Sequence, residues 1–179
     1  MAVLTKIETP LGIVIASSDG QSLTGLWFAG QKYECAFVED PIWDDSLPLW
    51  KNVKHALEDY FQGVGDVASA VPIAFVGGTA FQKAVWAVLT EIPYQTVWTY
   101  KDVAERVGEK LGRKTSSRAV GTAIGRNPIS LFVPCHRVVA TTGALTGYAG
   151  GVEQKRALLT LEGHSVVKDR VMKGERHEA

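Results

Sequence analysis

The spacing of the apolar residues changes near Gly77 and Gly78. Before this point, residues 11–17 (LGIVIAS) and 22–28 (SLTGLWF) are short strand-like runs, and the turn residues 18–20 (SDG) between them indicate a hairpin. After this point, apolar residues recur at the spacing of amphipathic helices. The sequence therefore predicts an α+β chain with its strands in the first part and mainly helices in the second.

Helices are predicted on both sides of this change. Residues 49–61 (LWKNVKHALEDYF) form the first helical pattern. Thr79 and Gln82 then form a capping-box pattern ahead of a second helix, residues 81–92, which Pro93 closes. A capping box fixes where a helix begins, so this start is well defined by the sequence.

Two further helices follow close together. Residues 100–107 have Thr99 as N-cap and Gly108 as the expected stop, and residues 117–124 have Ser116 as N-cap. The loop that joins them is basic and longer than the usual turn of a helix-turn-helix. The pair nevertheless resembles that motif, which is typical of DNA-binding proteins.

The domain boundaries follow from these patterns. We expect a first domain over residues 1–77, a second over residues 78–164 that ends in a helix from residue 152, and a polar tail over residues 165–179. A chain of 179 residues fits two small domains and buries roughly 70% of the surface that its unfolded form exposes. It can therefore support a proper hydrophobic core.

Composition excludes some classes of protein. No segment approaches the roughly 20 apolar residues of a membrane-spanning helix, and apolar and charged residues occur in globular proportions. The two cysteines, Cys35 and Cys135, form no disulfide framework and no zinc-type spacing. We expect a soluble cytoplasmic protein with two free thiols and no bound metal.

Charge is distributed unevenly along the chain, although the formal net charge is zero. Residues 1–80 carry four basic and ten acidic side chains, whereas residues 101–126 carry seven basic and three acidic ones. Such a basic stretch suits a nucleic-acid footprint, but it also suits a solvated helix face. Charge alone does not decide between the two.

Cys135 lies next to His136 and Arg137 in an otherwise apolar segment. A nucleophilic cysteine reacts as the thiolate, which nearby cations and proton acceptors favour. Adjacent side chains in an extended segment point to opposite faces, so contact between the thiol and the imidazole requires a turn, for which Pro134 is suited. A structural cysteine beside a surface histidine stays open on this pattern alone.

The surrounding motifs resemble a known family. PCHRVV, preceded by GRNP and followed by GYAGG and LEGH, is similar to the active-site region of the O6-alkylguanine-DNA alkyltransferases, also called methylated-DNA–protein-cysteine S-methyltransferases. The resemblance continues through FQKAVW, IPYQTVWTYKDVA and SSRAVGTAIGRNP, and so covers the whole C-terminal half. The N-terminal half resembles the family's small ribonuclease H-like α/β domain only loosely. The resemblance implies that a mainly helical, winged-helix-like domain follows it.

The resemblance also implies catalytic roles. Cys135 would be the alkyl acceptor, His136 the base that removes its proton through a bridging water, and Glu162 the group that orients His136. Asn127 matches the family's hinge asparagine between the DNA-binding helix and the active-site segment. Tyr100 matches the tyrosine that rotates the target phosphate and hydrogen-bonds N3 of the leaving guanine.

DNA recognition is implied by the same matches. The target guanine must leave the base stack before its O6 substituent can be attacked. Arg118 matches the arginine that fills the gap when the second helix of the motif enters the minor groove. The other residues expected to contact DNA surround it on this segment: Ser117, Ala119, Thr122 and Arg126.

The pocket for the base is expected to use backbone groups. The carbonyls of Cys135 and Val138 would face the exocyclic amine, and the amide of Ala149 would face O6. Tyr148 would line the wall. Thr146 stands where some relatives have glycine, which would narrow the entrance.

The implied activity is direct reversal of DNA damage. The alkyl group of O6-alkylguanine in double-stranded DNA passes irreversibly to Cys135, so each molecule acts once, as a monomer and without a cofactor. The range of alkyl groups and a reaction with O4-alkylthymine stay open. So do two other classes: a cysteine hydrolase using Cys135, His136 and Glu162, and a DNA-binding module without catalysis.

Overall fold

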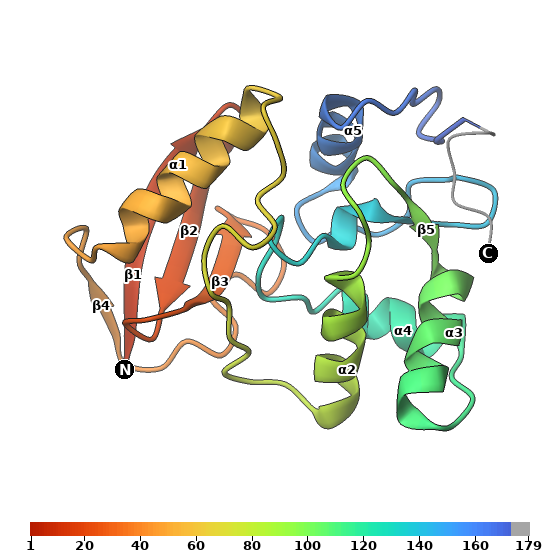
Figure 1. The fold of residues 1–179 in the computed structure, drawn as a ribbon, viewed down its shortest axis with the longest axis horizontal. Coiled ribbons are helices and arrows are strands. Elements are labelled where there is room, and N and C mark those ends of the chain that lie inside the picture. The colour runs from red at the N-terminus through yellow and green to blue at the C-terminus, as the bar shows by residue number, and fades with distance from the viewer. Residues whose placement is uncertain (173–179) are drawn as a thin grey trace. The chain divides into compact units, whose positions relative to one another are not determined.

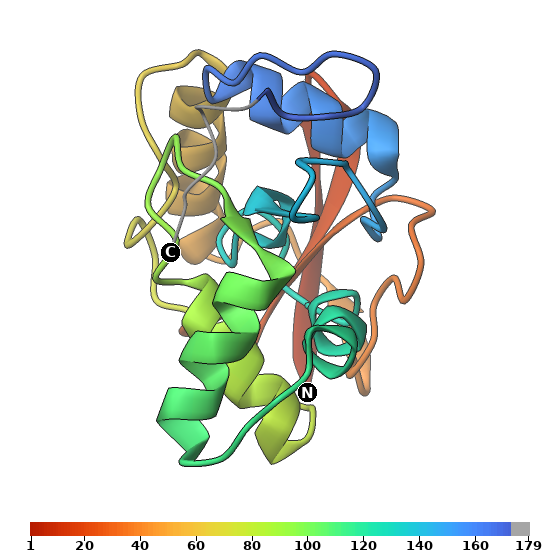
Figure 2. The same ribbon diagram turned by 90° about the vertical axis from the view of Figure 1, so that its right-hand side faces the viewer.

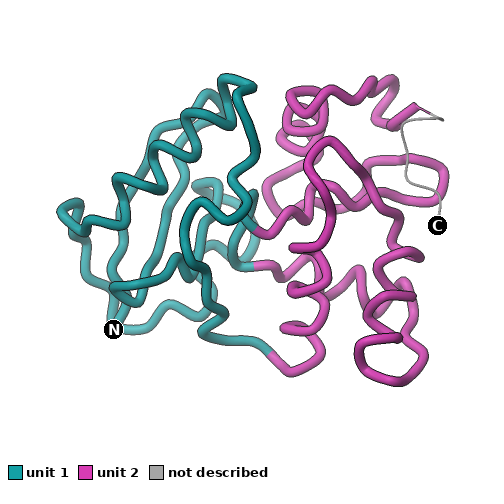
Figure 3. The backbone as a smooth tube through the Cα atoms, in the orientation of Figure 1, with its two compact units in different colours: residues 1–78, 128–132 teal, residues 79–127, 133–179 magenta. Residues whose placement is uncertain are grey.

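The computed structural model describes residues 1–172 (Figure 1). Contacts between Cα positions divide the chain into two compact units (Figure 3). Unit 1 contains residues 1–78 and 128–132, and unit 2 contains residues 79–127 and 133–179. The short segment 128–132 therefore belongs to the first unit, although its neighbours in the sequence on both sides belong to the second.

Unit 1 is built on a four-stranded sheet with the strand order β3-β2-β1-β4. Strands β1 (Ala2–Thr9), β2 (Gly12–Ser18) and β3 (Leu23–Phe28) pair antiparallel, and the short β4 (Pro41–Trp43) pairs parallel to β1. Helix α1 (Leu49–Phe61) packs against β1 (Figure 1). The predicted hairpin and helix are confirmed. Strand β4 was not predicted, because its three residues are all exposed and carry no alternating pattern.

Segment 128–132 extends this unit at β3. The Leu26 amide donates to the Pro128 carbonyl at 2.9 Å, and the Ser130 amide donates to the Leu26 carbonyl at 3.0 Å. Ile129 and Leu131 are almost fully buried there. The residues that lead into Cys135 are thus fixed by the sheet of unit 1.

Unit 2 contains three helices that pack on one another: α2 (Ala80–Leu89), α3 (Tyr100–Leu111) and α4 (Ser117–Ile124). The side view shows them together, with α5 (Val152–Leu161) apart from them (Figure 2). The short strands β5 (Trp98–Thr99) and β6 (Val138–Val139) pair in parallel. Because β5 leads directly into α3 and β6 follows the 3-10 turn η1 (Cys135–Arg137), this pairing brings the start of α3 close to Cys135.

The predicted helix starts in unit 2 are confirmed. Thr79 with Gln82 forms a complete capping box, Thr99 forms another with Asp102, and the Ser116 side chain accepts from the Ala119 amide. Each cap satisfies amides that the first turn leaves without a partner. The mixed α+β architecture is therefore as expected.

Three details differ from the sequence predictions. Helix α2 ends at Leu89, with Thr90 as its C-cap, and not at residue 92 next to Pro93. Helix α3 continues through Gly108 and ends at Gly112, which has the left-handed conformation (φ 68°) that closes a helix. Residues 165–172 are not a polar tail: they fold back, and Val171 is fully buried. The apolar partners that bury Val171 are distant in sequence, so the local composition concealed this packing. The rest of the expected tail, residues 173–179, lies outside the described residues.

None of the helices within residues 1–172 combines the length and the apolar character needed to span a membrane.

Candidate active site

Cys135 lies at the start of η1 and is 5% exposed. The side-chain amide of Asn127 donates to Cys135 Sγ at 3.1 Å and to the Val133 carbonyl at 2.8 Å. Asn127 follows α4 closely, so this side chain ties the end of α4 to the cysteine segment. Burial raises the pKa of the Cys135 thiol, while the Asn127 hydrogen bond and the charge of Lys155 oppose that rise.

A buried triad follows directly from η1. His136 Nε2 lies 2.5 Å from Glu162 Oε2, and Arg137 Nε donates to Glu162 Oε1 at 2.7 Å. All three side chains are at most 2% exposed. Burial alone would raise the pKa of Glu162, but the pairing with His136 and Arg137 outweighs it and holds that pKa well below its usual range. Glu162 is therefore an ionised carboxylate that holds the His136 ring and the Arg137 guanidinium in place.

The other ring nitrogen of His136 is available for chemistry. His136 Nδ1 is buried and has no hydrogen-bond partner among residues 1–172. The 3-10 turn supplies the bend that contact between neighbouring side chains requires. Since Nε2 is held by Glu162, Nδ1 is the atom that can accept a proton.

Lys155 on α5 is a component of the site that the sequence analysis missed. It is 1% exposed, and its Nζ donates to the carbonyls of Val138 at 2.5 Å and Thr146 at 3.2 Å. Burial lowers the pKa of Lys155 to about 8, although the nearby Cys135 opposes that shift. A signal was present: Lys155 occupies the same helix face as Val152 and Leu159, where an exposed lysine is not expected.

Tyr100, at the first position of α3, reaches the same place. Its hydroxyl donates to the Thr146 carbonyl at 3.0 Å, and the Thr146 hydroxyl lies 3.4 Å from it. Burial raises the pKa of Tyr100, and the neighbouring Cys135 raises it further. The hydroxyl therefore stays protonated at neutral pH and can act as a donor.

The other residues predicted to line the base pocket lie on β6 and on the segment that follows it. Val138 and Tyr148 are buried, Ala149 is half-buried and Thr146 is exposed. The Val138 carbonyl already accepts from Lys155, but a carbonyl has two lone pairs and can take a second donor. The structure thus brings Tyr100, Thr146, Val138 and Lys155 together beside Cys135.

The residues expected to contact DNA occupy the exposed face of α4 and the turn after it: Ser117, Arg118, Ala119, Thr122 and Arg126. The opposite face of α4 is buried and anchored by Trp86 Nε1, which donates to the Ala123 carbonyl at 2.9 Å. Arg118 makes no ion pair within the part of the chain that is described, and its side chain faces solvent. All five residues are exposed, whereas Cys135 is buried.

Fold and site together define a class: an α+β protein that combines a helix-turn-helix-like pair with a buried cysteine beside a histidine–glutamate pair. Residues 80–164 match the family model described as 6-O-methylguanine DNA methyltransferase, DNA binding domain. The chain is 40% identical over 160 residues to the methylated-DNA–protein-cysteine methyltransferase of Haemophilus influenzae, covering 88% of this chain and 84% of that protein.

Two further comparisons agree. The enzyme of the same name from Methanosarcina acetivorans is 38% identical, over 87% of this chain and 95% of that one. The crystal structure of Mycobacterium tuberculosis OGT in complex with DNA superposes with a TM-score of 0.77 at 35% identity, covering 89% of this chain and 92% of the other. The chain belongs to the methylated-DNA–protein-cysteine methyltransferase family.

Proposed function

We propose that this protein repairs alkylated DNA by direct reversal and that Cys135 accepts the alkyl group from O6 of guanine. The observation that carries the proposal is the buried Cys135 thiol, which accepts from Asn127, has its pKa lowered by the Lys155 charge and is followed in η1 by His136, whose Nε2 is held by Glu162. Family membership supports the same activity, since the relatives are methylated-DNA–protein-cysteine methyltransferases.

The first chemical step is deprotonation of the thiol. His136 Nδ1 takes the Cys135 proton, directly or through a water, and Glu162 stabilises the resulting imidazolium. Arg137 holds the same carboxylate, which keeps it ionised. The Lys155 ammonium supports the thiolate electrostatically, which offsets part of the cost of a buried negative charge.

The second step is an in-line displacement. The thiolate attacks the alkyl carbon, a C–S bond forms, the C–O6 bond breaks, and its electron pair goes to guanine. The Tyr100 hydroxyl donates a hydrogen bond or proton to the leaving base. The product is a thioether on Cys135, and the described site offers no second thiol to remove the alkyl group. Each molecule therefore reacts once.

The DNA partner is proposed to be double-stranded and bound by α4 in the minor groove. The lesion must leave the stack to reach a thiol that is 5% exposed. Arg118 takes the place of the extruded base, with Ser117, Ala119, Thr122 and Arg126 contacting the surrounding DNA. We further propose that the protein acts as a monomer, with unit 1 ribonuclease H-like and unit 2 winged-helix-like.

Intact-protein mass spectrometry tests this function. With excess duplex DNA that contains O6-methylguanine, the protein is expected to gain one methyl group once, on the peptide that contains Cys135. Cys135→Ser is the matched control: it should gain nothing yet bind the duplex with similar affinity, because phosphate contacts supply most of the binding free energy. Repeated turnover, or modification of Cys35 instead, would refute the assignment.

A further inference from the structure

The last described residues form a small hairpin on unit 2. Val167 and Arg170 exchange two backbone hydrogen bonds of 3.0 and 3.1 Å around a two-residue turn. Both turn residues, Lys168 and Asp169, have positive φ (51° and 56°), as the type I′ hairpin turn requires. Nothing in the proposed chemistry uses this hairpin.

The hairpin pairs with the loop that lines the proposed base pocket. The Leu145 amide donates to the Asp169 carbonyl at 2.8 Å, and the Val171 amide donates to the Gly143 carbonyl at 2.9 Å. Arg156 on α5 forms an ion pair with the Asp169 side chain. Two backbone bonds and one ion pair therefore connect the hairpin to its surroundings.

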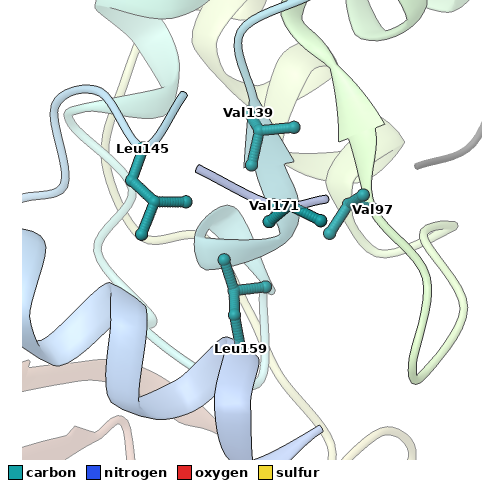
Figure 4. Close-up of a cluster of buried hydrophobic side chains, with 5 residues drawn as sticks. All are labelled: Val97, Val139, Leu145, Leu159 and Val171. Carbon is teal, nitrogen blue, oxygen red and sulfur yellow. The ribbon is translucent and has the colours of Figure 1, made fainter. Parts of the chain in front are cut away.

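Apolar packing reinforces the pairing. Val171 points into a cluster with Val97, Val139, Leu145 and Leu159, all at most 6% exposed (Figure 4). These partners come from four different segments: Val97 directly precedes β5, Val139 lies in β6, Leu145 lies in the loop and Leu159 lies in α5. Val171 is thus the residue through which the hairpin holds the loop against the body of unit 2.

The position of the Leu145 backbone affects the contacts made by the next residue, Thr146. Thr146 follows Leu145, and its carbonyl accepts from both the Tyr100 hydroxyl and Lys155 Nζ. Tyr100 and Lys155 therefore contact the loop at Thr146, and the hairpin contacts it at Gly143 and Leu145. A displacement of the Leu145 backbone would move the point at which Tyr100 and Lys155 converge.

We propose that the hairpin of residues 165–172 is a positioning element for the transfer reaction, and that Val171 is its principal contact. This inference rests on the proposed function. The hairpin does not touch the reacting atoms; it fixes the Thr146 carbonyl and so aligns Tyr100 and Lys155 beside Cys135. Loss of Val171 packing therefore slows transfer without weakening DNA binding, since α4 carries the DNA surface.

Val171→Ala tests this in the full chain, with Val167→Ala as the matched control because Val167 lies in the same hairpin but is 52% exposed. Single-turnover transfer is measured against DNA concentration and with free O6-methylguanine. Val171→Ala is expected to lower the maximal rate about tenfold on both substrates, since small misplacements of catalytic groups carry costs of this order. The half-saturating DNA concentration should change less than about twofold, and Val167→Ala should match wild type.

Rescue and exchange measurements separate positioning from simple stability. Val171→Ile should restore most of the rate, and hydrogen exchange at the Leu145 amide should accelerate in Val171→Ala alone. If Val171→Ala does not fold, Asp169→Asn tests the same link, because its side chain is only half-buried. A lower melting temperature with an unchanged maximal rate would overturn the proposal. Absence of transfer in wild type would instead refute the proposed function.

Discussion

At the residue scale, two cations are buried around Cys135, and they differ in how their charge is balanced. Arg137 is paired with Glu162, whereas Lys155 has no carboxylate partner within residues 1–172 and donates only to two carbonyls. A buried charge without a counter-ion is costly, which is why the pKa of Lys155 falls to about 8. The thiolate of Cys135 is the counter-charge that Lys155 lacks.

Lys155→Met is predicted to change the pH dependence of transfer. The Lys155 ammonium lowers the pKa of Cys135, so its removal raises that pKa and reduces the thiolate fraction at neutral pH. A rise of one unit would make transfer about tenfold slower near pH 7 and move the rise of rate with pH upward by about one unit. Single-turnover rates between about pH 6 and 9.5 provide the measurement.

Lys155→Arg is the control for this prediction, because it keeps a positive charge in the same place. The transfer rate of Lys155→Arg should rise over the same pH range as that of wild type, even if the rate itself is lower. The thiol and the ammonium titrate as a coupled pair, so the comparison uses the shift between profiles rather than a single assigned pKa. An equal loss at every pH in Lys155→Met would show that Lys155 acts by position rather than by charge.

Sequence reasoning reached some of these residues and missed others for a physical reason. Cys135, His136 and Asn127 lie in short motifs, so their placement was predictable from the chain and its resemblance. The His136–Glu162 pair spans two distant elements, and only the resemblance suggested it; the structure places the two atoms 2.5 Å apart. Lys155 was missed because a lysine on a helix is usually solvated, and its burial depends on tertiary packing.

At the element scale, the end of α3 is set by two glycines with different tasks. Gly112 takes the left-handed conformation, and the following Arg113 amide donates back to the Gly108 carbonyl at 3.0 Å. A Cβ on Gly108 would lie only 2.8 Å from the Arg113 carbonyl oxygen. Glycine is therefore required at position 108 because the Arg113 backbone passes close to it, and Gly108 does not end the helix. The helix caps were predictable because they depend on neighbouring residues in the sequence. The close contact between Gly108 and the Arg113 carbonyl was not, because it depends on the path of the chain after α3.

Gly108→Ala is predicted to destabilise the protein, although alanine favours a helix by about 1 kcal/mol relative to glycine. The clash with the Arg113 carbonyl outweighs that preference, because backbone must shift to relieve it. Gly121→Ala in α4 is the matched control: its Cβ would meet Tyr100 at 3.6 Å, an ordinary contact. Urea unfolding should give a lower free energy of unfolding for Gly108→Ala than for wild type, and no decrease for Gly121→Ala. Equal stabilisation of both variants would contradict the close-approach argument.

Helix α4 presents the residue that is proposed to fill the gap left by the extruded base. Arg118 is exposed on α4, so Arg118→Ala should leave Cys135, His136 and Glu162 undisturbed. If Arg118 fills the vacated stack, its loss should slow repair of duplex DNA by roughly tenfold or more, because each 1.4 kcal/mol is a factor of ten. Single-stranded DNA and free O6-methylguanine need little or no unstacking, so their rates should fall much less. An equal loss on the free base would mean that Arg118 supports the pocket or the fold.

At the scale of the whole molecule, neither compact unit is a continuous stretch of the sequence. Asn127 and Val133 belong to unit 2 and are joined by a side-chain hydrogen bond of 2.8 Å, while the five residues between them belong to unit 1. The sequence predicted one boundary between the two domains, near Gly77, because the spacing of the apolar residues changes there. It could not reveal that a segment of the second half pairs with β3, since that pairing joins Leu26 to Pro128 and Ser130.

This arrangement predicts how a fragment of residues 79–179 behaves. In the full chain Ile129 is fully buried and Leu131 is 1% exposed within unit 1. The fragment lacks their partners, and each exposed side chain forfeits about 1.5–3 kcal/mol of burial. The segment that leads into Cys135 should therefore loosen, so transfer to Cys135 should slow at least tenfold while small thiol reagents modify Cys135 faster. A full-length chain cleaved between Gly78 and Thr79 retains residues 1–78 and should react like the intact protein. Single-turnover transfer and thiol-labelling rates measure both effects, and a fragment that transfers as fast as the cleaved chain would show that the pairing of residues 128–132 with β3 does not support the site.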